Sequence, residues 1–364
     1  MMPESPHSSG RRRCAQEPRS RGYLRAPSLL FGSICFALLA HGANAIGGTP
    51  EYKARSTASG AIVAWGEPPF EPLVEKWAQA FQVHHPSVTV RHFLKGSGTA
   101  VGGLYTGVAN VGFFGREITA VETVTWQRIF PYEPLGFAIA TGSFDAFAET
   151  VAPAILVNVE NPLDHISFRQ LDAIYSYDRK RGTPTNFTKW GQLGLTGVWA
   201  DRPITIYGLD ADTGTVQFLR TRVLQNGRWS YEPRLPSAAP QTRYRGSGRD
   251  ASEALVGAIE RDAAAIGIAG FRNLTPKLKA LRVGETDDGP FVAGSRETVR
   301  DRTYPLSRLV YLFVNKDPNK PWDPAVYEFV SFVLSREGQE IIAKAGVYLP
   351  LPGALVQQER VKLN

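Results

Sequence analysis

Hydrophobic and polar positions follow two periodicities from residue 59 to the end of the chain. Short apolar or alternating runs, typical of strands, occur at 61–65, 88–93, 154–158, 204–207, 265–269 and 309–314. Between these runs, apolar side chains recur every three or four residues, as on the buried face of a helix. The first such segment carries Phe70, Leu73, Val74, Trp77 and Phe81. The alternation of strands and helices predicts an α/β fold with largely parallel central sheets.

Two boundary signals define the helices near the C-terminus. Asp323 followed by Pro324 combines an N-cap residue with a proline at the first helical position, so a helix is expected from there. Gly346 follows the next helical segment, 335–345, and glycine in the left-handed conformation commonly ends a helix.

The first 45 residues have the three parts of a secretory signal peptide. Arginines precede an apolar run at 29–40, and Ala43-Asn44-Ala45 then offers a small-x-small cleavage site. Because the apolar run is too short to span a bilayer, we predict a cleavable signal peptide at 1–45 and export to the periplasm. The alternative is an uncleaved membrane anchor.

The leader also accounts for most of the charge of the chain. The formal net charge is +7. The leader holds six arginines against two glutamates, so the remaining 35 basic and 32 acidic residues leave only +3 for the rest of the chain. Because the chain outside the leader carries so small a net charge, no nucleic-acid partner is expected.

Both cysteines, Cys14 and Cys35, lie in the predicted leader. The mature protein would therefore have no disulfide, no thiolate metal site and no cysteine nucleophile. Lipid attachment at Cys35 remains an alternative that the sequence leaves open. The pair His84-His85 lacks accompanying cysteines or spaced carboxylates, so no metal and no cofactor are expected.

Two loops share one design. Gly96-Ser97-Gly98-Thr99 and Asp212-Thr213-Gly214-Thr215 each stand directly before a helical segment. Free N–H groups and the positive end of the helix dipole favour an anion there, and glycine lets the backbone approach it. Ordinary N-capping is the alternative for either loop alone. Two matched loops in the two halves of the chain favour a shared oxyanion ligand.

Weaker candidates accompany these loops. Ser247, in Arg245-Gly246-Ser247-Gly248, precedes another helical segment, although a plain turn is the alternative. Arg116 could bind an anion through two hydrogen bonds, or form a salt bridge with Glu117 or another carboxylate. Asp210 and Asp212 could form an acid/base pair, but turn formation is the commoner role. Without a phosphate-loop lysine motif or a serine elbow, no catalytic residue is predicted and the protein is not expected to be an enzyme.

With these residues in hand, the chain resembles the substrate-binding proteins of bacterial phosphate ABC transporters, over about residues 59 to 355. The resemblance rests on the order and spacing of several short segments rather than on any one of them. These segments are the Gly96–Thr99 loop, 109–112, 155–162 (ILVNVENP), 171–175, Thr188-Lys189-Trp190, the Asp212–Thr215 loop, 264–269 (AAIGIA) and 304–308.

The resemblance implies a two-lobed fold of the type II periplasmic binding protein superfamily, in which each lobe has a sheet flanked by helices. Lobe 1 would comprise 59–144 and 303–364, lobe 2 would comprise 145–302, and two crossovers would join them. A monomer would close on inorganic phosphate by a hinge and deliver it to a membrane ABC permease, whose ATPase partner supplies the energy.

The resemblance also implies which residues contact the ligand. They are Pro69, Phe70, Ser97, Gly98, Thr99, Asn110, Thr213, Gly214 and Thr215, to which the residues themselves add Arg116 and Ser247.

Two departures bear on which ligand is bound. Asn110 stands where the family carries an aspartate that accepts a hydrogen bond from protonated phosphate and repels sulfate, and Leu209 stands where an arginine is usual. Another acceptor, such as Asp210, Asp212 or Glu117, and another cation, such as Arg116 or Arg245, would be needed. Phosphate is the expected ligand; sulfate, molybdate, a phosphonate, or hydrolysis of a phosphate ester on the same fold are the alternatives.

Overall fold

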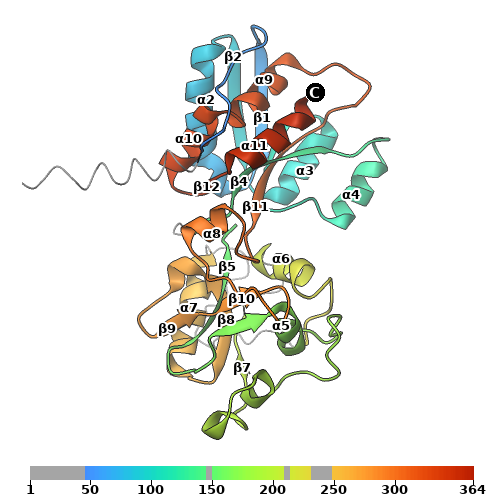
Figure 1. The fold of residues 1–364 in the computed structure, drawn as a ribbon. Coiled ribbons are helices and arrows are strands. Elements are labelled where there is room, and N and C mark those ends of the chain that lie inside the picture. The colour runs from blue at the N-terminus through green and yellow to red at the C-terminus, as the bar shows by residue number, and fades with distance from the viewer. Residues whose placement is uncertain (1–45, 145–149, 209–213, 231–247) are drawn as a thin grey trace, which may run out of the picture. The chain divides into compact units, whose positions relative to one another are not determined.

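The computed structural model describes residues 46–144, 150–208, 214–230 and 248–364 (Figure 1). The predicted leader lies outside these ranges, as do Leu209, Asp210, Asp212, Thr213, Arg245 and Ser247. Within the described ranges, no helix has both the length and the apolar character needed to cross a bilayer.

A six-stranded mixed sheet organises the first core, in the order β12-β4-β11-β3-β1-β2. Its strands are β1 (Gly60–Gly66), β2 (Val88–Leu94), β3 (Val111–Phe114), β4 (Leu135–Thr141), β11 (Leu309–Val314) and β12 (Leu349–Pro350). Strand β1 pairs in parallel with β2 and β3, whereas β11 runs antiparallel to β3 and β4. Strand β11, which follows the second core in the chain, therefore runs in the direction opposite to β1, β2 and β3.

The helices of the first core are α2 (Glu71–His84), α3 (Ser97–Thr106), α4 (Ala120–Gln127), α9 (Pro324–Val333), α10 (Arg336–Ala345) and α11 (Gly353–Arg360), with the 3₁₀ turns η1 (Pro68–Phe70) and η5 (Val361–Leu363). The apolar faces of α2, α9, α10 and α11 pack on the sheet in one cluster, whose largest members include Trp77, Phe81, Phe113 and Phe329. Helices α3 and α4 pack in a smaller, separate cluster with Phe114 and Phe313. The predicted boundaries are confirmed. The Asp323 carboxylate accepts hydrogen bonds from the N–H groups of residues 325 and 326, and Gly346 ends α10 with φ 71°.

A four-stranded sheet, in the order β7-β8-β5-β9, organises the second core. Its strands are β5 (Pro153–Asn158), β7 (Thr205–Ile206), β8 (Ala265–Gly270) and β9 (Leu278–Ala280), and β6 (His165–Ser167) pairs separately with β10 (Arg282–Gly284). The helices are α5 (Phe168–Tyr175), α6 (Gly214–Arg222), α7 (Gly248–Arg261) and α8 (Arg296–Arg300), with 3₁₀ turns η2 (Trp190–Leu193), η3 (Gly197–Trp199) and η4 (Phe271–Asn273).

The α/β class is confirmed, but the second sheet is less parallel than the pattern suggests. Only β7 and β8 run parallel in it, because β5 lies antiparallel to both β8 and β9. Apolar runs identify buried strands without giving their direction. Its buried side chains form a cluster distinct from the first, with members drawn from 152–306 and from Leu349.

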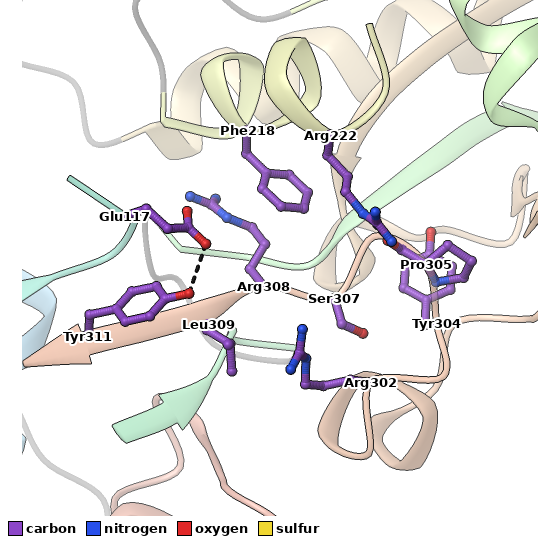
Figure 2. Close-up of a pocket in the computed structure, with 10 residues that line it drawn as sticks. All are labelled: Glu117, Phe218, Arg222, Arg302, Tyr304, Pro305, Ser307, Arg308, Leu309 and Tyr311. Atoms are coloured by element: carbon purple, nitrogen blue, oxygen red, sulfur yellow. Dashed lines mark hydrogen bonds between the residues drawn. The ribbon is translucent and has the colours of Figure 1, made fainter. Parts of the chain in front are cut away.

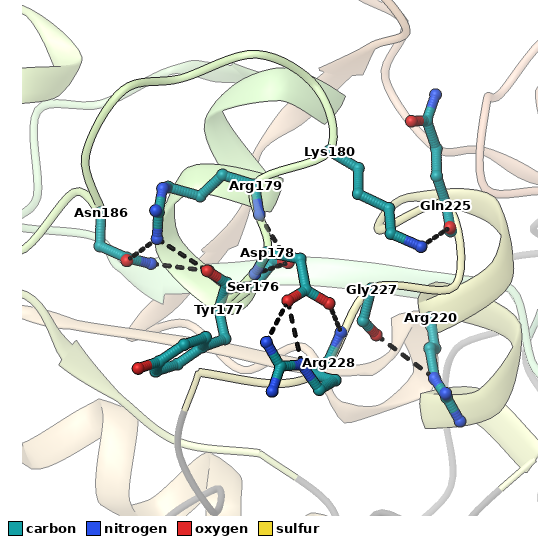
Figure 3. Close-up of polar contacts among 10 residues, drawn as sticks. All are labelled: Ser176, Tyr177, Asp178, Arg179, Lys180, Asn186, Arg220, Gln225, Gly227 and Arg228. Atoms are coloured by element: carbon teal, nitrogen blue, oxygen red, sulfur yellow. Dashed lines mark hydrogen bonds and ion pairs between the residues drawn. The ribbon is translucent and has the colours of Figure 1, made fainter.

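Polar contacts fix the C-terminal end of α6 to the segment after α5 (Figure 3). The Asp178 carboxylate accepts hydrogen bonds from the backbone N–H of Arg228 at 2.8 Å and from its guanidinium at 2.6 Å. Hydrogen bonds from Arg228 hold the pKa of Asp178 at about 2. Lys180 Nζ donates to the carbonyl oxygen of Gln225 at 3.1 Å. These contacts support the turn that follows α6, the helix whose start enters the site described below.

A buried network joins the N-terminal segment to α2 and α9. The His85 ring accepts a hydrogen bond from Ala58 N at Nδ1 (3.2 Å), and Nε2 lies 2.6 Å from the Tyr52 hydroxyl, which donates to Glu328 Oε2 at 2.8 Å. Because Nδ1 accepts, the ring is neutral, with its proton on Nε2. Burial lowers the pKa of His85, and this outweighs the opposite effect of the Glu328 carboxylate.

We expect the stability conferred by His85 to fall at acidic pH. Its pKa is lower folded than unfolded, so the unfolded chain takes up a proton first and stability is lost as pH drops below about 6.5. The measurement is the decrease in Tm between pH 7.5 and pH 5.5, which should be smaller in His85→Gln than in the wild type. His84→Gln, on the exposed neighbouring ring, is the control, and an equal effect of both variants would contradict the assignment.

Candidate functional site

The loops that follow β1, β2 and β3 meet at one edge of the six-stranded sheet. Gly96 N donates to the carbonyl oxygen of Gly66 at 2.8 Å, and Glu67 N donates to that of Phe113 at 3.3 Å. The three strands are parallel, so this edge is formed by their carboxyl ends. Ligands of α/β proteins bind outside such ends, which makes this edge the candidate site.

Helix α3 begins at this edge. Gly96 adopts φ 134°, a conformation that glycine reaches without strain, and Thr99 Oγ1 donates to its carbonyl oxygen at 2.7 Å. Among the described residues, no atom beyond the adjoining residues and the backbone of α3 itself lies within 4 Å of the place that a Cβ on Gly98 would occupy. The first N–H groups of the helix have no intrahelical acceptor, so the backbone around Gly98 can be approached by an anion.

The carboxylate of Glu67 lies against the start of α3. The Ser97 hydroxyl donates to Glu67 Oε1, so it has no proton left for a ligand. Glu67 is only 8% exposed, and its second oxygen, Oε2, is buried without a hydrogen-bond partner among the described residues. A Cβ added to Gly115 would fall 2.3 Å from this Oε2 and 1.9 Å from Thr150 Oγ1. The side chains of Glu67 and Thr150 thus occupy the volume beside Gly115.

Replacing Gly115 by alanine should therefore destabilise the protein. The added methyl group overlaps two polar side chains, and such overpacking costs about 1–3 kcal/mol. Gly98→Ala is the matched control, since its methyl group would enter open space and glycine to alanine within a helix stabilises by about 0.5–1 kcal/mol. Thermal unfolding of both variants measures the difference. A Gly115→Ala protein as stable as the wild type would contradict this packing.

Arg308 joins the strand ends to helix α6. It directly precedes β11, is 3% exposed, and donates through Nη2 to the carbonyl oxygen of Gly115 at 3.1 Å. Longer contacts of 3.5 Å reach Thr215 Oγ1 and the carbonyl oxygen of Gly214, the first two residues of α6. Burial lowers the pKa of Arg308 to about 10, and the charges of Glu67 and Glu117 oppose that shift. The guanidinium therefore stays charged at neutral pH.

A cavity of about 260 Å³ adjoins the same guanidinium (Figure 2). Arg308 extends between Glu117 and Phe218, with its Cζ 5.1 Å from the centre of the phenylalanine ring. The Tyr311 hydroxyl donates to Glu117 Oε1 at 2.8 Å. Arg222, Arg302 and Ser307 complete the polar part of the lining, and the remaining walls are Tyr304, Pro305 and Leu309.

Several predicted contact residues have other partners. Asn110 precedes β3, where its Oδ1 accepts from Val63 N at 2.8 Å and its Nδ2 donates to the carbonyl oxygen of Ala61 at 2.8 Å. It therefore holds the start of β3 onto the first half of β1, away from the strand ends. Arg116 forms two hydrogen bonds of 2.7 and 2.8 Å with Glu122, which fits the salt-bridge alternative.

The predicted contacts in the turn after β1 are also engaged. The Phe70 ring is fully buried and lies 5.3 Å from the Phe113 ring and 5.0 Å from the Tyr348 ring, and its N–H donates to the carbonyl oxygen of Glu67. Pro69 has no N–H to donate. The structure thus places Ser97 against Glu67, and Gly214 and Thr215 against Arg308, which also contacts Gly115. Gly98 and Thr99 follow Ser97 in the first turn of α3.

Glu67 and Arg308 were not among the residues predicted from the sequence. Arg308 ends the 304–308 segment that contributes to the family resemblance, and Glu67 follows the first strand directly. Their positions at strand ends were the only available signal, because an isolated charged residue does not reveal its partners.

The fold and this site define a class of solute-binding protein. A model of the PBP superfamily domain matches residues 52–337, so the chain belongs to the PBP superfamily. Solved structures show the same fold. PstS from Borrelia burgdorferi has a TM-score of 0.54 at 16% identity, over 80% of this chain and 98% of that one. An ABC-type phosphate transport receptor from Vibrio cholerae has a TM-score of 0.52 at 20% identity, over 79% of this chain and 100% of that one.

Curated relatives narrow the class to one family. The phosphate-binding protein PstS of Pseudomonas aeruginosa is 30% identical over 309 residues, which cover 85% of this chain and 88% of that protein. PstS of Staphylococcus aureus is 24% identical over 316 residues, covering 85% and 83%. The chain is a member of the PstS family of phosphate-binding proteins.

Proposed function

We propose that this protein captures inorganic phosphate outside the cytoplasm and delivers it to a membrane ABC permease, without catalysing a reaction. The observation that carries the proposal is that Arg308 links the start of α6 to the loop after β3, at the sheet edge where α3 also begins. Two helix N-termini and one buried guanidinium at one place form a site for a small oxyanion. The names of the relatives favour phosphate among such anions.

The proposed contacts combine predicted and observed residues. The backbone at Ser97 and Gly98, with the side chains of Thr215 and Arg308, would supply donors to the phosphate oxygens. The Thr99 hydroxyl already donates to the carbonyl oxygen of Gly96, so its contact with the ligand remains a prediction from the sequence. Thr213 and Ser247 remain predictions from the sequence. Asn110 and Arg116, which the structure engages elsewhere, take a structural part in this proposal.

The division into lobes belongs to the same proposal. Lobe 1 would comprise 59–144 and 303–364, and lobe 2 would comprise 145–302, with closure about the two crossovers. The largest apolar clusters support this division, since one holds mainly described residues of 59–144 and 303–364 and the other holds mainly residues of 152–299, joined by Tyr304, Leu306 and Leu349 next to the second crossover. Residues 1–45 would direct a monomer to the periplasm and be removed there.

Calorimetric titration of the exported protein with phosphate, sulfate and molybdate tests the ligand. We expect phosphate to bind in a one-to-one complex and an aryl phosphate to remain unhydrolysed. Absence of binding of every oxyanion at millimolar concentration would contradict the proposed function. Co-purification with a permease tests the transport role, which a signalling protein of the same fold would not show.

A further inference from the structure

We propose that Glu71, Glu75 and His92 form a binding site for a divalent transition metal ion, with Zn²⁺ as the best match to its donors. The site lies on α2 and β2, outside the oxyanion site, and does not depend on the proposed function. No metal was expected from the sequence, because these residues belong to two elements and match no linear metal-binding motif.

Two carboxylates come from the first turns of α2. Glu71 is the first residue of this helix, and Glu75 follows it by four positions. Side chains at positions i and i+4 lie one above the other on the same face of a helix. Like charges at this spacing repel each other, so a cation bound between the two carboxylates would relieve an unfavourable contact.

The imidazole comes from β2, on the side that α2 covers. Alternate side chains of a strand point to the same face, so His92 shares its face with Val88, Val90 and Leu94. These three neighbours pack in the apolar core together with residues of α2. Helix α2 lies along β2 (Figure 1), and the His92 side chain is only 27% exposed. The packing therefore restricts the imidazole ring next to the helix that carries the carboxylates.

The three ligand atoms converge on one point. One oxygen of each carboxylate and one ring nitrogen of His92 all lie within 4.8 Å of one another. Zn²⁺ binds such atoms at about 2.0–2.2 Å in a tetrahedral arrangement, which places neighbouring ligand atoms about 3.4 Å apart. Because both glutamates are exposed, rotation of their side chains by about 1 Å closes the set around an ion without moving the backbone.

The donor set selects the kind of ion. Imidazole nitrogen suits Zn²⁺, Cu²⁺ and Ni²⁺, whereas Mg²⁺ and Ca²⁺ take oxygen ligands. Three protein ligands leave the fourth position of Zn²⁺ to water, which is the composition of an open site rather than a closed structural one. We therefore expect an ion that exchanges with the solution and is not required for folding.

Ordinary electrostatics is the competing explanation. Glu71 lies where the helix dipole favours an anion, and a protonated His92 could pair with Glu75, whose Oε1 lies 4.0 Å from Nε2. An exposed pair at such a distance contributes little to stability. It is also the only ion pair that either glutamate forms among the described residues, so no lysine or arginine there neutralises the two carboxylates. A divalent ion would neutralise both.

Calorimetric titration of the exported protein with Zn²⁺, without an affinity tag and in a phosphate-free buffer, tests the site. We expect one ion per chain. His92→Gln and Glu75→Gln should each weaken binding at least about tenfold, since loss of even an outer partner of a metal ligand costs that much.

His84→Gln is the matched control. Its Nε2 also lies close to a carboxylate, 3.0 Å from Glu337 Oε2, but within the described part of the chain it belongs to no group of three ligands. The Zn²⁺ affinity of this variant should stay close to that of the wild type.

Each result decides the inference. A His92→Gln protein that binds Zn²⁺ as tightly as the wild type would overturn it, and so would a wild type that binds no Zn²⁺ at millimolar concentration. Weakening by His84→Gln instead of His92→Gln would place the ion at the other histidine and also overturn it. If His92→Gln fails to fold by circular dichroism, Glu75→Gln, on an exposed helix face, decides in its place. Phosphate capture is measured separately and stands or falls independently of these results.

Discussion

Replacing Arg308 by methionine is expected to weaken phosphate binding at least about 100-fold, the largest effect of any single substitution in the site. Methionine keeps much of the length and apolar contact of the arginine stem. It removes the donors to Gly115 and Thr215 and the charge that offsets Glu67. Loss of one member of a buried charged group leaves the other uncompensated, which adds to the direct loss. Isothermal titration with phosphate is the measurement.

Arg116→Met provides the matched control for that experiment. Arg116 belongs to the same loop as Gly115, but its guanidinium is engaged by Glu122. We expect its phosphate affinity to stay within threefold of the wild type. Arg308→Lys should fall between the two, because lysine keeps the charge without the planar fork. Equal affinities of Arg308→Met and the wild type would remove Arg308 from the site.

The second large effect concerns stability. Glu328, fully buried in α9, accepts hydrogen bonds from the Tyr52 hydroxyl at 2.8 Å, from Arg55 N at 2.9 Å and from Ser56 N at 3.0 Å. Glu328→Ala would leave these donors without an acceptor, at a cost of about 2–4 kcal/mol. We expect a matching decrease in the denaturation midpoint in urea.

Glu328→Gln separates the lost acceptor from the lost charge. Its amide oxygen can keep the two N–H donors, and its NH₂ group can donate to the Tyr52 oxygen, so most of the stability should remain. A glutamine variant as unstable as the alanine variant would show that the charge itself stabilises the segment. An alanine variant as stable as the wild type would show that water replaces the carboxylate.

Local chemistry was predictable because it depends on neighbours in the sequence. The N-cap at Asp323, the left-handed Gly346 and the loop before α3 each follow from a few adjacent residues. The α/β class follows from the period of the apolar positions. The direction of β5 could not be predicted, because a run of apolar residues has the same pattern in a parallel and in an antiparallel strand.

The candidate site was only half predictable for a related reason. The loop at 96–99 could be recognised from its glycine and hydroxyl residues before a helix. The role of Glu67, in contrast, depends on the pairing of β1 with β3, which brings the loops after these two strands together. Arg308 reaches the site because β11 enters the sheet next to β3, and the two are nearly 200 residues apart in sequence. The prediction for Asn110 relied on the order of motifs. The register instead pairs this residue with Ala61 and Val63, before the strand ends.

Because of the crowding at Gly115, positions 67 and 115, which directly follow the neighbouring strands β1 and β3, are expected to change together in evolution. With Glu67 Oε2 filling the volume beside Gly115, a side chain at 115 and a glutamate at 67 exclude each other. A side chain introduced at 115 alone would overlap Glu67. A small residue at 67 would make room for it, so that a carboxylate at 115, after β3, could replace the carboxylate of Glu67, after β1. The two positions should therefore show strong epistasis, and related proteins could differ at both while keeping the same ligand.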